Sequence, residues 1–387
     1  MVEFREKVLP LPHETTILIQ YLRGTGAGIQ FLRCQLLLPL FQKEYGQITT
    51  GVPGNKEWGI CKLSKCEYKI VTVNRIKMSK LPILSVIIPA FNAENTIKQC
   101  IESTLTQSNE DIEVIVVNDG STDRTSAICD ELAAKDQRVK VVHQENKGRT
   151  AARETGVLKA SADWICFLDA DDTLPPDSLQ QLYSMTADCT DIVFGNGYTL
   201  NGERRTTIPL EEFRHLAVKG EGTIGVPWGS LYRRSMLSHY LFDLSRDICM
   251  GEDYIFWLRL IFSTSKPVNV VYQKVYDKGP DTTSSTFVWT AEYAQTVHAL
   301  RMQSIPREKH SLYMHETIED RIANLMAVTM FQSKRVWNKS EFYLDLMRDM
   351  EACQYHFTLK QKLFLSLPST KLRRTYSRAS DFIHSLR

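Results

Sequence analysis

The chain has 387 residues, of which 43% are hydrophobic and 24% are charged, the composition of a globular protein with a sizeable core. Its 47 Lys and Arg residues balance 45 Asp and Glu residues to a formal net charge of +2, which gives no reason to expect a nucleic-acid partner. Nine cysteines without a Cys-x-x-Cys pair favour a reduced, cytoplasmic protein. No apolar run approaches the ~20 residues that span a bilayer, and the N-terminus has no secretory-signal pattern.

Residues 1–77 show no regular pattern and contain frequent Gly and Pro, so they are interpreted as an N-terminal extension of uncertain structure with no assigned function. Met78 precedes Ser-Lys-Leu-Pro and an apolar run, which leaves two hypotheses: Met78 is the true translation start, or residues 1–77 form a genuine small region. Cys61 and Cys66 favour free thiols over a metal site, because no second pair and no nearby His supply further ligands.

Short apolar runs alternate with helical patterns from Leu84 onward. Strands are predicted at 84–88, 112–117, 139–142 and 164–168, and helices at 95–106, after Asp123 and at 150–160. Strands that are apolar on both faces and linked by helices predict an α/β fold, in which helices flank a mostly parallel central sheet. We expect this α/β domain to span residues 78–290.

The alternation fades beyond Leu200. A strand is still expected at 268–272, and the polar loop 277–285 after it is expected to fold over a bound ligand. Helical periodicity then predicts a helical C-terminal region over 291–387, as at Ile318, Ile322, Leu325 and Val328.

Three carboxylates follow the predicted strand 164–168: Asp169, Asp171 and Asp172. Ligands bind at the carboxyl ends of strands in parallel sheets, so these residues are candidates for a site. Carboxylates so close together repel one another unless a cation lies among them, and their spacing suits Mg²⁺ or Mn²⁺ shared with a diphosphate. The alternative is that Asp172 begins a turn and caps a helix, while the other two are solvated.

Four motifs stand in order along the predicted α/β domain. They read Ser-Val-Ile-Ile-Pro-Ala-Phe-Asn-Ala-Glu (85–94), Val-Asn-Asp-Gly-Ser-Thr-Asp (117–123), Asn-Lys-Gly-Arg-Thr-Ala-Ala-Arg (146–153) and Phe-Leu-Asp-Ala-Asp-Asp (167–172). In these motifs the chain resembles the nucleotide-binding half of inverting family 2 glycosyltransferases, which have a GT-A type fold. The resemblance implies an enzyme that transfers a sugar, with inversion, from a nucleotide diphosphate donor, expected to be a UDP-sugar, to an acceptor hydroxyl.

The same resemblance implies roles for the residues that follow the first two strands. Pro89, Phe91 and Glu94 are expected to line the pocket for the base and ribose, and Asp119 to hydrogen-bond the base. For Phe91 internal packing is the alternative. Many relatives carry two acids where this chain has Asn118 and Asp119.

The resemblance also implies roles for residues near the phosphates. Asp169 is expected to face the ribose and sugar, and Asp171 to bind the divalent ion, Mn²⁺ or Mg²⁺. Arg153 either faces the pyrophosphate or braces the acidic segment, and the sequence leaves both roles open.

Two further segments, 226–234 and 251–256, resemble the family's landmarks for the acceptor half. By that resemblance Asp253 is the general base that removes the acceptor proton, with Glu252 beside it. Both also open a predicted helix, where carboxylates are favourable, so capping is the alternative. Trp228 either stacks on the acceptor sugar or belongs to the core, and Ser230 stands where relatives often carry Lys.

The expected setting is the synthesis of a cell-surface polysaccharide or glycolipid, with a glycan or a lipid-linked acceptor. The alternative is a catalytically inactive partner subunit that binds a nucleotide sugar. A dinucleotide oxidoreductase is disfavoured, because no Gly-x-Gly-x-x-Gly follows the first strand.

The basic tail, residues 359–387, holds seven Lys or Arg and one acid, with apolar residues among them. Such a tail suits the surface of an anionic membrane, and it predicts peripheral association with the cytoplasmic face. A solvated terminal helix is the alternative.

Overall fold

The computed structural model describes residues 82–108, 111–279 and 287–385, together with five short strands within the first 69 residues. The chain divides into two compact units, Met1–Lys80 and Leu81–Arg387. Met78, the alternative start, lies outside the described residues, as do residues 280–285 of the expected loop and the last two residues of the basic tail.

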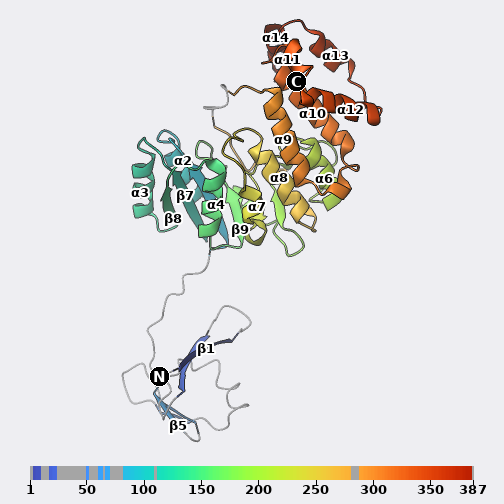
Figure 1. Cartoon of the computed structure of the whole chain (residues 1–387). Helices are drawn as coiled ribbons and strands as arrows, with labels where there is room; N and C mark the ends of the chain where they lie inside the picture. The colour runs from blue at the N-terminus through green and yellow to red at the C-terminus, as the bar shows by residue number, and fades with distance from the viewer. Residues whose placement is uncertain are drawn as a thin grey trace. The chain divides into compact units, whose positions relative to one another are not determined.

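The N-terminal unit contains two small antiparallel sheets (Figure 1). One pairs β1 (Glu3–Leu9) with β2 (Ile17–Arg23), and the other has the order β3 (Thr49–Gly51), β4 (Ile60–Leu63), β5 (Cys66–Lys69). Cys61 lies on β4 opposite Tyr68, and Cys66 begins β5 opposite Leu63, so the two cysteines are not paired in register.

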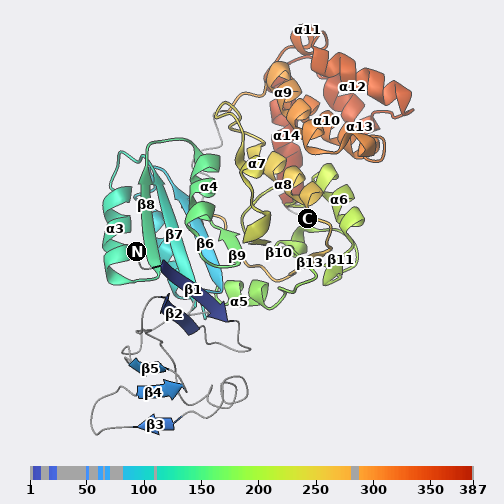
Figure 2. The same cartoon turned by 60° about the horizontal axis from the view of Figure 1, so that its bottom comes forward.

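The second unit is built on an eight-stranded sheet in the order β11-β13-β10-β12-β9-β6-β7-β8 (Figure 2). Four strands, β8, β7, β6 and β9, run parallel, and β12 lies antiparallel between β9 and β10. Beyond it, β13 is parallel to β10 and β11 antiparallel to β13. The strands are β6 (Leu84–Ala90), β7 (Ile112–Asp119), β8 (Val139–Gln144), β9 (Trp164–Phe167), β10 (Ile192–Phe194), β11 (Thr207–Ile208), β12 (Leu231–Arg233) and β13 (Val268–Val270).

Helices cover both faces of this sheet, because its central strands are apolar on both sides. On β6, Val86 and Ile88 pack against one set of helices and Ile87 against the other. The first face carries α2 (Ile97–Leu105), α3 (Thr125–Lys135) and α5 (Ser178–Tyr183). The second carries α4 (Arg149–Lys159), α6 (Leu210–Lys219), α7 (His239–Phe242) and α8 (Glu252–Ser263). These layers confirm the predicted α/β class and the mostly parallel sheet.

The approach of α4 to the sheet depends on a glycine. A Cβ on Gly156 would lie 2.3 Å from Cγ2 of Ile87, so a larger residue would push the helix away from β6. The helix that carries Arg149 and Arg153 is therefore held close to the strands that end at the cavity described below.

The C-terminal region is helical, as predicted, with α9 (Ala291–Ser304), α10 (Met314–Thr329), α11 (Lys334–Trp337), α12 (Glu341–Ala352), α13 (Leu359–Ser366) and α14 (Thr370–Ser385). Its core is centred on Ile318, Ile322 and Leu325 of α10, the helical stripe read from the sequence. Figures 1 and 2 show these helices beside α6 and α8, which contact α10 and α9. Within the described parts of the chain, no helix combines the length and apolarity needed to cross a membrane.

Candidate active site

A cavity of about 650 Å³ lies at the carboxyl ends of β6, β7 and β9. Asp119 at the end of β7 lines it together with four stretches: the end of β6 and the segment after it (89–96), the approach to α4 with its first turn (146–152), the loop after β9 (169–171) and the connection from the end of α7 to the start of α8 (242–252). Its volume falls within the ~300–1,000 Å³ of ordinary small-molecule sites.

Six of the ten residues singled out in the sequence line this cavity: Pro89, Phe91, Asp119, Asp169, Asp171 and Glu252. Arg153 and Asp253 are joined to that wall by ion pairs. The side chains of Glu94 and Trp228 are outside the lining and make other contacts.

The segment after β6 is fastened to the loop after β7. Asn92 has a φ of 48°, and its backbone N–H donates to Oγ of Ser121 at 3.0 Å. The Glu94 carboxylate accepts from the backbone N–H of Arg124 at 3.0 Å, so it serves the N-terminus of α3 instead of the cavity wall. Phe91, by contrast, is 51% exposed and lines the cavity, which favours ligand contact over internal packing.

Asp119 is buried at the end of β7 and organises the loop that precedes α4. Its Oδ1 accepts from Gln144 Nε2 at 2.7 Å and from the Lys147 N–H at 2.8 Å, and its Oδ2 accepts from the Gly148 N–H at 2.8 Å. A carboxylate has about four lone-pair positions, so acceptor capacity remains for a ligand in the cavity. Gly148 has a φ of 93°, a conformation that favours glycine at this turn.

Arg153 is buried on α4 and joins the two halves of the site. Its Nη2 donates to Oδ1 of Asp169 at 2.8 Å, and its Nη1 donates to Oδ1 of Asp253 at 2.6 Å. Burial lowers the pKa of a guanidinium, but the two carboxylates outweigh burial and raise the pKa of Arg153 above its ordinary value. Of the two roles left open by the sequence, these contacts favour bracing of the acidic segment.

A second pair lies one helical turn earlier. Arg149 donates to Oε1 of Glu252, which is buried at the start of α8. Burial raises the pKa of Glu252 and the neighbouring Asp253 adds to the rise, while Arg149 opposes it. Two arginines four residues apart on α4 therefore face two consecutive acids on α8, which fixes α8 against α4.

The acidic loop, residues 169–172, was expected to hold a divalent ion. Asp171 lines the cavity. Within the described part of the chain, Asp169 bonds to Arg153 through only one of its two carboxylate oxygens, Oδ1. Asp172 is directed elsewhere: its oxygens accept from Tyr276 and from the Gly279 N–H. Burial raises the pKa of Asp172, and the charges of Asp171 and Asp169 add to it.

The carboxylate oxygens of Asp171 and Asp169 fit a divalent ion that is shared with a ligand. The described residues contain no group of three or more His, Cys, Asp or Glu side chains that could hold a metal ion alone. Mg²⁺, however, commonly takes one or two protein carboxylates, with phosphate oxygens and water completing its shell. Asp171 and Oδ2 of Asp169 can supply that share.

Trp228 is connected to the acidic loop through Tyr276. Its ring stacks on Tyr276, with centroids 4.2 Å apart and an interplanar angle of 18°. Tyr276 in turn hydrogen-bonds Asp172 and the backbone of Asp169. One face of the Trp228 ring is therefore covered by protein. The residue is partly packed in the core, which leaves its other face for the alternative role, a contact with the acceptor sugar.

Sequence reasoning missed Arg149, Tyr276 and the 242–249 wall of the cavity. A signal existed for Arg149, because it stands four residues before Arg153 and so on the same helix face. Tyr276 follows a three-residue strand in a region without clear periodicity, and its hydrogen-bond partners are more than 100 residues away, so no local pattern pointed to it.

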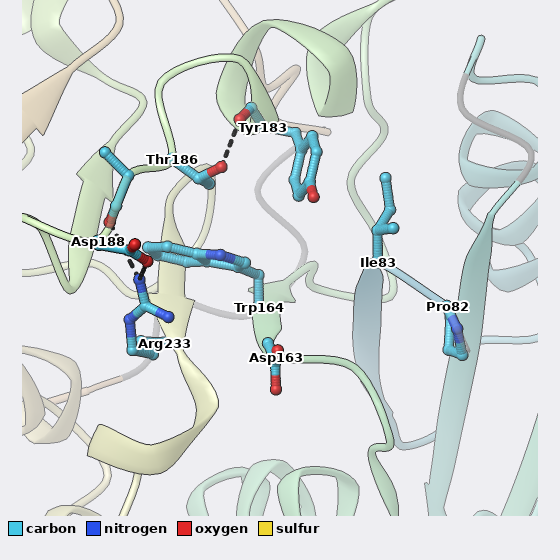
Figure 3. Close-up of a pocket in the computed structure, with 9 residues that line it drawn as sticks. Pro82, Ile83, Asp163, Trp164, Tyr183, Thr186, Asp188 and Arg233 are labelled. Atoms are coloured by element: carbon cyan, nitrogen blue, oxygen red, sulfur yellow. Dashed lines mark hydrogen bonds and ion pairs between the residues drawn. The ribbon is translucent and has the colours of Figure 1, made fainter. Parts of the chain in front are cut away.

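A second cavity, of about 530 Å³, lies at the opposite ends of the strands, where β6 and β9 begin (Figure 3). Arg233 stands under the ring of Trp164, with its guanidinium carbon 4.7 Å from the ring centroid. That guanidinium already donates to the Ala187 carbonyl and pairs with Asp191. None of the residues predicted for the site lies here, which leaves the first cavity as the candidate.

Residues 85–241 match the model of glycosyl transferase family 2. The chain is 28% identical over 268 residues to Glycosyltransferase GlyA of Streptococcus pneumoniae, covering 62% of this chain and 38% of that protein. It is 36% identical over 193 residues to the putative glycosyltransferase EpsH of Bacillus subtilis, covering 47% and 56%. The chain thus spans between about two fifths and three fifths of the length of these relatives.

Among solved structures, the crystal structure of S. aureus TarS 1–349 in complex with UDP-GlcNAc aligns at 18% identity and a TM-score of 0.47, covering 71% of this chain and 93% of that one.

The family match covers all four motifs and ends in α7, so it contains β6 to β9, the acidic loop and Arg153. Residues 85–241 thus carry a match to glycosyl transferase family 2, and the α/β unit has the GT-A type fold expected of that family.

Proposed function

We propose that this protein is a metal-dependent glycosyltransferase that transfers a sugar from a UDP-sugar to an acceptor hydroxyl, with inversion at the anomeric carbon. The observation that carries the proposal is the bridge made by Arg153, which holds Asp169 of the acidic loop and Asp253 of α8 on one guanidinium. This arrangement joins a donor-side carboxylate that lines the cavity, Asp169, to a candidate base, Asp253, through one shared guanidinium.

On the donor side, the base and ribose would lie between Pro89, Phe91 and Asp119, with Asp169 toward the ribose and sugar. Asp171 would hold the divalent ion, with Mn²⁺ or Mg²⁺ as the candidates, and the ion when bound would stabilise the charge of the departing diphosphate.

On the acceptor side, Asp253 would accept the proton of the attacking hydroxyl. Its Oδ1 is held by Arg153, which fixes the orientation of the carboxylate, while Glu252 is held in place by Arg149. The face of the Trp228 ring that does not stack on Tyr276 is the proposed contact for an acceptor sugar.

Isothermal titration with UDP, with and without Mn²⁺, tests the donor half of this proposal. We expect binding that is tighter with the metal, and release of sugar or its transfer when a panel of nucleotide sugars is supplied. A folded protein that binds no nucleotide diphosphate under either condition would contradict the proposal. Tight UDP binding without turnover of any donor would favour the alternative, an inactive partner subunit.

The setting we propose is the synthesis of a cell-surface polysaccharide or glycolipid, on a glycan or lipid-linked acceptor. Both relatives named above are described as glycosyltransferases from bacteria, which supports a bacterial glycan as the product class. We propose that the protein acts in the cytoplasm, at the membrane face that the basic tail would contact.

A further inference from the structure

The third carboxylate of the acidic loop is used inside the protein. Asp172 is only 4% exposed, and both of its oxygens accept hydrogen bonds. The hydroxyl of Tyr276 donates to Oδ2 at 2.5 Å, and the backbone N–H of Gly279 donates to Oδ1 at 2.6 Å. Asp172 therefore fastens the segment 276–279 to the acidic loop.

Tyr276 makes a second contact with the loop. Its hydroxyl oxygen accepts from the backbone N–H of Asp169 at 3.2 Å, so one hydroxyl bridges two members of the acidic loop. The ring is 1% exposed and stacks on Trp228, which fixes the position of that hydroxyl.

The backbones of the two segments also pair. The N–H of Thr173 donates to the carbonyl of Asp277 at 3.0 Å, and the reverse bond measures 2.9 Å. A Cβ on Gly279 would stand 2.0 Å from the carbonyl oxygen of Asp171, so only glycine permits this approach. Segment 276–279 thus packs against the backbone of Asp171, the residue proposed to hold the metal, and supports it.

We propose that Tyr276 is a positioning residue for the metal site: through Asp172 and the Asp169 backbone it holds the acidic loop in the conformation that presents Asp171 to a divalent ion. This inference rests on the proposed function and deepens it. Outer hydrogen-bond partners of metal-binding carboxylates commonly contribute ~10–100-fold to metal affinity. Asp172, on this account, stabilises the support and does not coordinate the ion.

Tyr276→Phe is the direct test, because it keeps the ring on Trp228 and removes only the hydroxyl. We expect Mn²⁺-dependent UDP affinity, measured by isothermal titration, to fall by about tenfold, and saturating Mn²⁺ to restore it. UDP affinity without metal should match that of the wild type, which a general loss of folding would not allow.

Tyr272→Phe is the matched control. The Tyr272 hydroxyl also bonds backbone, accepting from the N–H and donating to the carbonyl of Arg205, but it has no contact with the acidic loop among the described residues. We expect wild-type UDP and Mn²⁺ affinities from this variant, with thermal unfolding recorded for both.

Two results would overturn the inference. One is unchanged Mn²⁺-dependent UDP binding in Tyr276→Phe. The other is loss of Mn²⁺ binding in Asp172→Asn that saturating Mn²⁺ does not restore, which would make Asp172 itself a ligand. If the wild-type protein binds no UDP at all, the proposed function fails first, and that outcome is distinct from both.

Discussion

Arg153 shows why a single residue can connect two distant motifs. Its planar guanidinium presents donors in fixed directions, and it meets Asp169 on one side and Asp253 on the other. A buried cation between two carboxylates is stabilised by both, and each carboxylate is held in a defined orientation. Lysine has no such fork, so it would not replace this bridge.

Asp253→Asn removes the proposed base while keeping the size of the side chain. Since an amide cannot take up the acceptor proton, we expect kcat to fall by ~10²–10⁴-fold. UDP affinity should change little, because Asp253 is not among the residues that line the cavity. Steady-state kinetics with the donor found in the nucleotide-sugar screen, together with UDP titration, measure the two quantities separately.

Asp163→Asn is the control for that experiment. Asp163 is an exposed carboxylate beside the second cavity, at the opposite ends of the strands, and its removal should leave kcat unchanged. Equal kcat values for wild type and Asp253→Asn would exclude Asp253 as the general base.

At the residue scale, the sequence was most informative where side chains follow long apolar strands. Asp119 and Asp169 could be placed at one edge, because the carboxyl ends of parallel strands meet there. Glu94 shows the limit of that reasoning: its segment was placed correctly, but its carboxylate turns to the N–H of Arg124. Which way a loop side chain points depends on partners that the local sequence does not reveal.

Among elements, Glu113 of β7 holds several together. Its carboxylate accepts from Ser85 on β6 at 2.6 Å, from Lys140 on β8 at 2.5 Å and from the Ser161 N–H between α4 and β9 at 2.7 Å. Burial raises the pKa of a carboxyl group, but these hydrogen bonds outweigh it and lower the pKa of Glu113 to about 2.

This lowered pKa predicts a pH dependence of stability. In the unfolded chain Glu113 titrates near 4.5, so its contribution is complete above that pH and is lost as the pH falls toward about 2. The difference between the pKa of Glu113 in the unfolded chain and in the folded protein corresponds to about 3 kcal/mol of folding free energy. We expect Glu113→Gln to lower the free energy of unfolding by a similar amount at pH 7, and by much less near pH 2.

Denaturant unfolding across that pH range measures the effect, with Glu131→Gln as the control. Glu131 is exposed on α3 and makes no hydrogen bond or ion pair within the described chain, so its removal should be neutral. A loss of stability in Glu113→Gln that did not vary with pH would contradict the ionic origin of the effect.

The predictability of the elements follows their length and pattern. The four parallel strands were found because each is an apolar run between helical segments, and their observed bounds lie close to the predicted ones. The antiparallel β12 was not predicted, since it has three residues and lies in a segment rich in aromatic and basic side chains. Its position between β9 and β10 is set by pairing with both strands, which is long-range information.

Across the whole molecule, the basic tail is part of the C-terminal helical core. Arg373 on α14 is buried, and its guanidinium donates to the carbonyls of Thr329 and Leu367. It thus satisfies the carboxyl end of α10, where cations are favourable, and is not available to a membrane. On α13, in contrast, Leu359 and Leu363 are 85% and 54% exposed.

Leu359 and Leu363 are four residues apart, so they lie on one face of α13, with Lys360 and Lys362 beside them. Exposed leucines flanked by lysines suit an anionic bilayer surface, where each basic residue contributes about 1 kcal/mol. We expect the protein to sediment with vesicles rich in phosphatidylserine at low salt and to be released from them by high salt. We expect it not to sediment with phosphatidylcholine vesicles. Leu359→Ser combined with Leu363→Ser should abolish sedimentation. Leu344→Ser, which changes a leucine that is 50% exposed on acidic α12, should not. Sedimentation that survives the double substitution would assign the tail to the solvated surface instead.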